Sequence, residues 1–96
     1  MRFTLKTLTL NGREIHFSGA WLDWERPGPT TLWTGFVQGA DGTALMEIPE
    51  LELAAETIDG RQLVGRVLVP AASLNGDAFR LQGTDVLLAE GRDLGG

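Results

Sequence analysis

The chain has 96 residues, of which 43% are hydrophobic and 22% are charged, and its 13 acids against 8 bases give a net charge of −5 at pH 7. This length allows one domain with a modest core, and the composition is that of a folded globule. The absence of cysteine excludes disulfides and thiolate chemistry, and the acidic balance disfavours nucleic acid as a partner.

The start of the chain, MRFTLKTLTL, lacks the apolar core and the cleavage site of a signal peptide. No apolar run approaches the roughly 20 residues that span a bilayer. We therefore expect a soluble, cytoplasmic protein without a membrane partner, and membership of a virion agrees with the same features.

The first predicted strand covers residues 2–10, with a bulge near residues 6–7 where the alternation of apolar side chains changes phase. The Asn11-Gly12 pair is the strongest hairpin signal in the chain, because a type I′ turn requires positive φ at both central residues. The second strand then returns over residues 13–22, with Leu8 opposite Ile15.

The middle of the chain alternates turn signals with short apolar runs. Residues 25–30, ERPGPT, predict a loop, because proline cannot donate to a strand ladder. Residues 31–38 predict a strand that is apolar on both faces and therefore central. Residues 39–42 turn the chain, and residues 43–48 predict a fourth strand.

Residues 49–58, PELELAAETI, fit two types of secondary structure, a strand or a helix. Strand alternation places both leucines on one face, whereas a helix would begin at Pro49 with acids in its first turn. We favour the strand, because Asp59-Gly60 gives a second type I′ signal and residues 64–70 provide a partner strand.

The last predicted strand covers residues 78–88 and follows a loop at residues 70–76. A bulge at Gly83-Thr84 accounts for a change of phase within this strand. Residues 91–96 are polar and rich in glycine, so we expect a flexible tail after a single β domain of residues 1–90.

Short apolar runs at regular spacing, separated by turn residues that include many of the 13 glycines, predict an all-β domain. We expect six to seven antiparallel strands in a small, partly open barrel of the SH3-like or OB-like type. A β-sandwich is the second choice.

Residues 9–15, TLNGREI, and residues 57–63, TIDGRQL, are near copies. Either the chain contains a duplicated three-stranded half, or the same turn chemistry occurs twice. We favour the second explanation, because Asn-Gly or Asp-Gly with apolar flanks is what a two-residue hairpin requires. Arg13 and Arg61 follow the two turns and are candidates for contact with a partner.

The sharpest candidate for a binding site lies at Trp21 and Trp24. Three positions along a strand place the two rings on opposite faces, so one can lie in the core and the other outside. Asp23 and Glu25 flank Trp24, and an exposed Trp beside carboxylates suits sugar stacking or a protein contact. The competing explanation is that every Trp packs into the barrel or covers its ends.

The chain is poor in catalytic groups. His16 is the only histidine, and an exposed cross-strand position explains it more simply than an acid/base role with Glu14. Glu50, Glu52 and Glu56 share one strand face, where solvated acids discourage edge aggregation. The sequence shows neither a phosphate-binding loop nor a set of zinc ligands. We therefore expect no metal site, no cofactor and no enzymatic activity.

These observations favour a non-catalytic module for protein interaction or assembly, either self-associating or part of a larger complex such as a virion. The alternative is a small-ligand or carbohydrate-binding domain that uses an exposed Trp24 with the nearby acids. A carboxylate-based enzyme ranks third.

Overall fold

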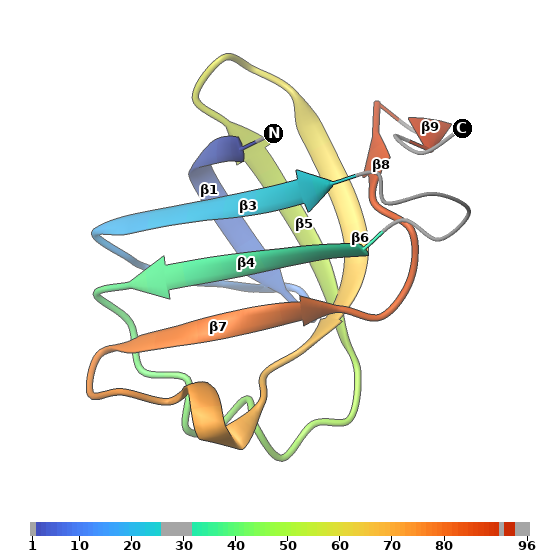
Figure 1. Cartoon of the computed structure of the whole chain (residues 1–96). Helices are drawn as coiled ribbons and strands as arrows, with labels where there is room; N and C mark the ends of the chain where they lie inside the picture. Colours follow the sequence, from blue (N-terminus) through green and yellow to red (C-terminus); the bar gives the residue numbers. More distant parts are fainter. Residues whose placement is uncertain (1, 26–31, 91, 94–96) are drawn as a thin grey trace.

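The computed structural model of the chain describes residues 2–25, 32–90 and 92–93. Within these residues the chain is all-β apart from one short 3-10 helix (Figure 1). The elements are β1 (Arg2–Leu10), β2 (Arg13–Glu14), β3 (Gly19–Glu25), β4 (Leu32–Gln38), β5 (Leu51–Thr57), β6 (Gln62–Leu68), η1 (Ala71–Ser73), β7 (Ala78–Gly83), β8 (Leu88–Ala89) and β9 (Arg92–Asp93).

Among the described residues, six antiparallel strands close into a barrel in the order β1–β3–β4–β7–β6–β5, and β5 pairs with β1 again. Strands β5, β1, β3 and β4 form a Greek key, because the long connection after β4 returns the chain to the free side of β1. The short strands β2, β8 and β9 extend the sheet. The predicted small all-β barrel is confirmed, and its ring of strand pairing is complete.

Strand β1 joins two parts of the barrel by changing its partner along its length. Residues 2–4 pair with β3, and residues 5–10 pair with β5. The register shifts between Leu5 and Thr7, which confirms the predicted bulge. Because a bulge bends a strand and increases its twist, it helps β1 to pass from one partner to the other.

The Asn11-Gly12 turn has the type I′ geometry that the sequence predicts. Both residues have positive φ, 51° and 79°, and Leu10 faces Arg13. The Ile15 N–H donates to the Leu8 carbonyl at 2.8 Å, as this register requires.

The strand predicted over residues 13–22 is interrupted. β2 contains only Arg13–Glu14, and β3 begins at Gly19. The hairpin register would pair Thr4 with Gly19, whereas Thr4 pairs with Trp21. The additional residues are accommodated in the irregular segment 15–18, where the Ser18 N–H donates to the Gln38 carbonyl at 2.8 Å.

The Asp59-Gly60 stretch forms a different turn, so the second type I′ prediction is wrong. Gly60 has a φ of 92°, while Asp59 does not have positive φ. The Gly60 N–H donates to the Thr57 carbonyl at 3.0 Å, as in a type I turn that ends in a left-handed glycine. Glu56 therefore faces Gln62, one residue away from the predicted register.

The side chain of Thr57 explains this difference. Its hydroxyl is buried, donates to Asp59 Oδ1 and accepts the Arg61 N–H. These local bonds stabilise the longer turn in place of a two-residue hairpin. The sequence similarity between the two tips therefore does not extend to the structure of the turns.

Residues 43–48, predicted as a strand, form consecutive turns instead. The Asp41 carboxylate accepts hydrogen bonds from the N–H and the hydroxyl of Thr43, and such local bonding competes with strand pairing. The Leu45 N–H donates to the Gly42 carbonyl, and the Leu45 side chain is buried. The strand predicted within 49–58 is confirmed as β5, and the helix alternative is wrong.

The strand predicted over residues 78–88 is interrupted where the sequence predicts a bulge. β7 ends at Gly83 beside β6, and the chain pairs with β6 again only as β8. Of the predicted tail 91–96, Arg92–Asp93 pair with β8. The rest of that tail, like residues 26–30 of the predicted loop, lies outside the described residues.

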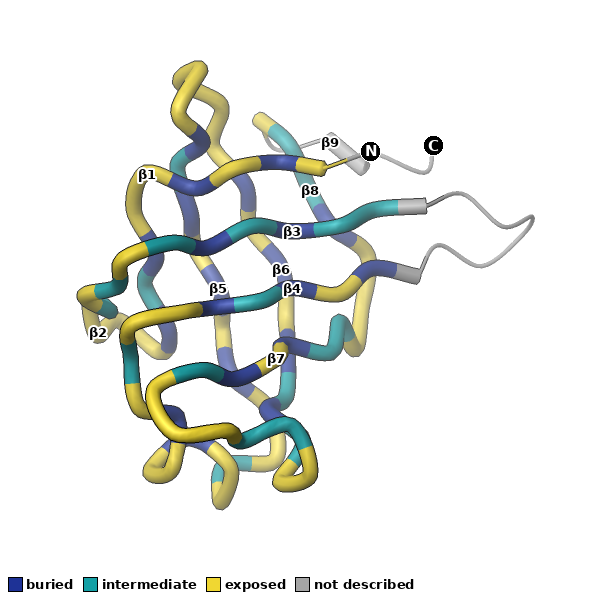
Figure 2. The backbone as a smooth tube through the Cα atoms, turned by 60° about the vertical axis from the view of Figure 1, so that its left-hand side comes forward, coloured by how far each residue is buried: buried dark blue, intermediate teal, exposed yellow. Residues whose placement is uncertain are grey.

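Buried residues alternate with more exposed ones along the strands (Figure 2). The buried side chains, most of them aliphatic, form one core cluster inside the barrel. Trp33 has the largest of the fully buried side chains. Its ring lies against Gly65 and Gly83, where a Cβ atom would come within 2.7 Å and 2.5 Å of ring atoms. Glycine at these two positions therefore creates the space that the indole occupies.

Candidate functional site

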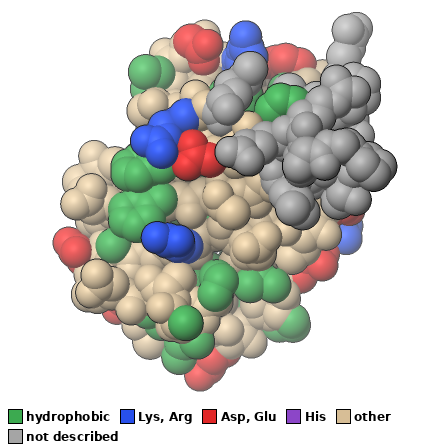
Figure 3. All heavy atoms as spheres, viewed as in Figure 1, with side chains coloured by type: hydrophobic (Ala, Val, Ile, Leu, Met, Phe, Trp, Pro, Cys, Tyr) green, Lys and Arg blue, Asp and Glu red, His purple; other side chains and the backbone are tan. Residues whose placement is uncertain are grey.

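The outer surface of β1, β3, β4 and β7 carries two rows of side chains that strand register sets side by side. The first row, in that strand order, is Thr4, Trp21, Phe36 and Arg80. The second row is Arg2, Asp23, Thr34 and Gln82. Figure 3 is viewed toward this surface and shows hydrophobic side chains with basic groups on either side of them. We call these two rows the aromatic face.

Trp21 is held from both sides on the aromatic face. Its ring stacks on Phe36, with centroids 4.9 Å apart and planes at 25°. The Arg2 guanidinium lies 4.9 Å from the centroid of the Trp21 ring. Because β1 and β4 flank β3, Arg2 and Phe36 approach Trp21 from opposite sides. The indole therefore has a fixed orientation outside the barrel core.

Asp23 anchors the guanidinium that covers Trp21. Arg2 Nε donates to Asp23 Oδ1 at 2.8 Å, and Arg2 Nη2 donates to Oδ2 at 3.2 Å. This bidentate geometry fixes the plane of the guanidinium. The hydrogen bond to Asp23 raises the pKa of Arg2. Asp23 thus acts together with Trp21, although Trp24 is its neighbour in sequence.

A groove of about 950 Å³ runs between the aromatic face and the segment around η1. Strands β3, β4 and β7 form its floor, and Pro70 with residues 72–75 forms its wall. Ser73 Oγ donates to the Pro70 carbonyl at 2.6 Å and accepts the Arg80 N–H at 3.2 Å. These bonds tie the wall to β7, so the groove is preformed.

Arg80 places a second positive charge beside the aromatic pair. Within the described part of the chain its guanidinium has no ion pair, whereas Arg2 is paired with Asp23. Trp21 and Phe36 therefore lie between two arginines from distant strands. The net acidity of the chain is therefore not reflected on this face, where the aromatic side chains are flanked by basic groups.

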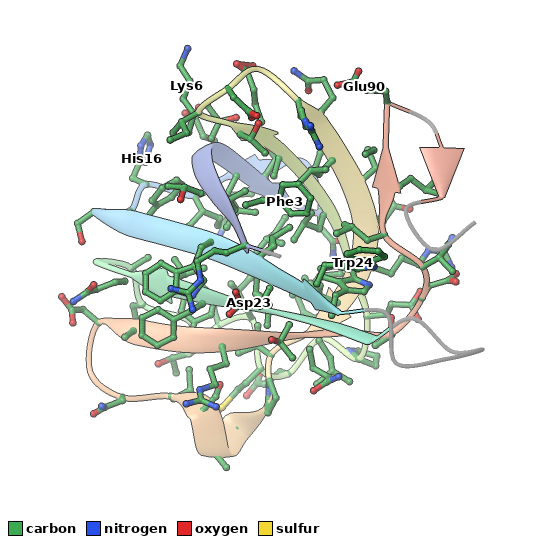
Figure 4. All side chains as sticks on the ribbon, turned by 45° about the horizontal axis from the view of Figure 1, so that its top comes forward. Phe3, Lys6, His16, Asp23, Trp24 and Glu90 are labelled. Carbon is green, nitrogen blue, oxygen red and sulfur yellow. The ribbon has the colours of Figure 1, made fainter. Side chains whose placement is uncertain are left out.

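Trp24 lies on the opposite face of β3 from Trp21, as the spacing predicts. It faces Trp33 across the β3–β4 ladder and packs against the core while it stays partly exposed. Figure 4 shows the Asp23 and Trp24 side chains apart from each other. The structure thus separates Trp24 from Asp23, and the side chain of Glu25 lies outside the description.

The two arginines that follow the turns lie at opposite ends of the β1–β5 pair. In the turn before Arg13, the Asn11 N–H donates to the Glu52 carbonyl of β5. In the turn before Arg61, the Ile58 N–H donates to the Thr4 carbonyl of β1. Arg61 Nε lies 3.7 Å from an Asp59 carboxylate oxygen, and its guanidinium lies 5.9 Å from the centroid of a core aromatic ring. Neither arginine lines the groove beside Trp21.

A second groove, of about 630 Å³, crosses the outer surface of β5 and β6 beside β8. Its exposed apolar side chains include Val64 and Val86, which are 48% and 38% exposed. Acidic and basic groups lie among the apolar ones. The lining residues used below are Glu52, Ala54, Val64, Arg66, Asp85, Val86 and Leu88. We call this surface the β5–β6 groove.

The acids of β5 point outward, as strand alternation predicts, and two acids of this region have cationic partners. Arg66 Nη1 lies 3.0 Å from Glu50 Oε1, and Lys6 Nζ lies 3.9 Å from Glu56 Oε2. The carboxylate of Glu52 has no ion pair with any described residue. Glu52 therefore carries a negative charge on β5 that lacks a cationic partner among the described residues, and this residue lines the β5–β6 groove.

Two exposed carboxyl groups have lowered pKa values, and both act in turns. The Thr57 hydroxyl, followed by a smaller effect of the Arg61 charge, lowers the pKa of Asp59. The Thr43 hydroxyl and N–H lower the pKa of Asp41.

His16, the one histidine of the sequence, is exposed. Across the described ranges, no cluster of three or more His, Asp or Glu side chains could hold a metal ion.

Sequence reasoning missed Arg2, Phe36 and Arg80 as members of this site. The outward position of Phe36 follows from the alternation of strand 31–38 once Trp33 is assigned to the core. No local signal could identify the two arginines, because strand order and register bring them beside Trp21.

Comparisons with models of protein families, with curated protein sequences and with solved structures found no match to this chain. The described residues contain no helix with the length and apolar character needed to cross a bilayer.

Proposed function

We propose that the chain is a non-catalytic binding module whose aromatic face docks on a protein partner. The observation that carries this proposal is the position of Trp21, stacked between Arg2 and Phe36 outside the barrel core. Trp and Arg are enriched among the residues that dominate protein interfaces. A large ring that is already fixed loses little conformational entropy when a partner binds.

The arrangement around Trp21 favours a protein partner over a sugar. Sugars stack on an uncovered aromatic face, and the two sides of Trp21 already carry Arg2 and Phe36. The groove of about 950 Å³ beside Arg80 supports a small ligand as the second candidate, because its volume lies in the range of ligand pockets.

The proposal places the module in the cytoplasm or in a larger assembly such as a virion, with proteins as its partners. A net charge of −5 repels anionic lipid surfaces and nucleic-acid backbones. No metal, cofactor or catalytic step takes part in this function.

A photo-activated cross-linking side chain at position 34 tests the function in the cells that make the protein. Thr34 is exposed in the middle of the aromatic face, and Ala44, exposed in the turns after β4, is the control position. We expect protein adducts from position 34 at several times the yield from position 44. Trp21→Ala should abolish these adducts, because it removes the central contact.

Equal adduct yields from positions 34 and 44 would contradict the proposed function. Adducts that persist unchanged in Trp21→Ala would contradict it as well. Circular dichroism of the Trp21→Ala variant confirms that the barrel is intact in the comparison.

A further inference from the structure

We propose that the partner of the aromatic face is the β5–β6 groove of a second copy of this chain, so that copies associate head to tail. This inference rests on the proposed function, because the aromatic face is the docking surface in both. It adds the identity of the partner and the surface that the partner presents.

The two surfaces are complementary in apolar character. The aromatic face presents Trp21 and Phe36, which are partly exposed on the outer side of the barrel beside the groove of about 950 Å³. The β5–β6 groove presents Val64 and Val86 in a depression. Interfaces of this kind combine an apolar centre with a charged or polar rim.

The two surfaces are also complementary in charge. Arg80 borders the aromatic pair, and its guanidinium lacks an ion pair among the described residues. Glu52 and Asp85 line the β5–β6 groove, and neither carboxylate has an ion pair among those residues. Asp85 Oδ1 accepts the Val86 N–H at 2.8 Å, which leaves its negative charge uncompensated. The charged groups without an ion pair among the described residues are therefore basic on the aromatic face and acidic in the β5–β6 groove.

The order of strands around the barrel sets the geometry of this contact. β3 and β4 lie across the barrel from β6 and β5, so one copy cannot bring its own two surfaces together (Figure 1). A head-to-tail contact leaves one aromatic face and one groove free at the ends, and such contacts generate rings or filaments. A two-fold contact between aromatic faces would instead bring the Arg80 side chains of both copies to one interface, where like charges repel.

Sedimentation of the purified full chain tests this inference between about 10 μM and about 1 mM. We expect the average mass of the wild type to rise above 10.4 kDa with concentration. Arg80→Glu should lower the association constant by about tenfold or more, because the reversal places like charges at the contact. Arg61→Glu makes the same change of net charge outside both surfaces and should leave association within about twofold of the wild type.

Charge exchange between the two surfaces distinguishes the head-to-tail contact from other contacts. The double variant Glu52→Lys/Asp85→Lys should also lose about tenfold or more in association when it is alone. An equimolar mixture of this variant with Arg80→Glu should recover association. In the mixture the acidic aromatic face of Arg80→Glu meets the basic groove of the double variant. The basic aromatic face of the double variant meets the acidic groove of Arg80→Glu. Opposite charges therefore face each other at both kinds of contact.

Three results would overturn the inference. The wild type could stay at 10.4 kDa up to about 1 mM, Arg61→Glu could weaken association as strongly as Arg80→Glu, or the mixture could fail to recover. Adducts from position 34 that contain a different protein, with a monomeric wild type, would overturn this inference and leave the proposed function standing. The absence of any adduct at position 34 would contradict both this inference and the proposed function.

Discussion

The indole N–H of Trp33 donates to the carbonyl of Asp85 at 2.6 Å and thereby joins β4 to the connection between β7 and β8. The same ring lies against Gly83, the last residue of β7. A buried donor without an acceptor costs about 1–3 kcal/mol, so this bond fixes the depth at which the ring lies. One Trp in the core thus positions the segment that also forms one side of the β5–β6 groove.

Gly83→Ala should destabilise the barrel. A Cβ at this position would lie 2.5–2.7 Å from three atoms of the Trp33 indole, and such overpacking costs about 1–3 kcal/mol. Urea denaturation measures the loss. Gly19→Ala is the matched control, because its Cβ would meet no atom within 4 Å and its φ is not positive. A loss at Gly19→Ala as large as that at Gly83→Ala would contradict the packing explanation.

Substitutions at Asn11 should separate backbone strain from hydrogen bonding. Asn11 has a φ of 51°, and its Oδ1 accepts the Glu52 N–H at 2.7 Å. Asn11→Gly keeps the left-handed geometry and loses the side-chain bond, at a cost of about 1 kcal/mol. Asn11→Ala should cost about 1 kcal/mol more, because a Cβ strains this φ. Thermal unfolding that finds Asn11→Ala as stable as Asn11→Gly would show that strain has no part.

Thr57→Val should raise the pKa of Asp59 toward its ordinary value of 3.8, because the hydrogen bond from the Thr57 hydroxyl is the largest cause of its lowering. NMR titration of the Asp59 carboxyl measures this change. A carboxyl whose pKa is lowered on folding stabilises the native state above pH 3.8, and this contribution disappears as pH falls through the lowered value.

The stability difference between the wild type and Thr57→Val should therefore narrow as the pH falls below about 4. Thr57→Ser keeps the hydroxyl and should keep the lowered pKa. An Asp59 pKa that is the same in the wild type and in Thr57→Val would show that another group lowers it.

Trp21→Ala should abolish binding while it costs the fold little. Trp21 lies on the outer surface, so we expect a loss in unfolding free energy of about 1 kcal/mol. Trp33→Phe removes buried ring volume and the bond to Asp85, and we expect a loss of about 2–4 kcal/mol. Urea denaturation of the two variants checks the order. A larger loss from Trp21→Ala would mean that the aromatic face belongs to the structural core.

Local signals predicted the first hairpin and failed at the second. At Asn11-Gly12 the turn residues alone determine the geometry, because both adopt positive φ. At Asp59-Gly60 a buried hydroxyl at Thr57 adds local hydrogen bonds that select a longer turn. The strand predicted over 43–48 failed for a similar reason, since Asp41 bonds to the backbone and side chain of Thr43.

The candidate site could be predicted only in part, because its contacts are not local in sequence. Alternation correctly places Trp21 and Trp24 on opposite faces, but it cannot show which ring is outside. The pairing of β3 with β1 and β4 decides this and brings Arg2 and Phe36 against Trp21. Arg80 joins the site from β7, whose place beside β4 depends on closure of the barrel.

The most direct test of the account is NMR of the indole signals after selective ¹⁵N labelling of the three tryptophans. Spectra are recorded on the dilute purified protein and on the same protein in concentrated extract of the cells that make it, with Trp21→Phe to assign the signal of the outer ring. If the aromatic face is the docking surface, the Trp21 signal shifts in the extract, while that of buried Trp33 keeps its position. An unchanged position of the Trp21 signal, or equal shifts of all three signals, would contradict the claim.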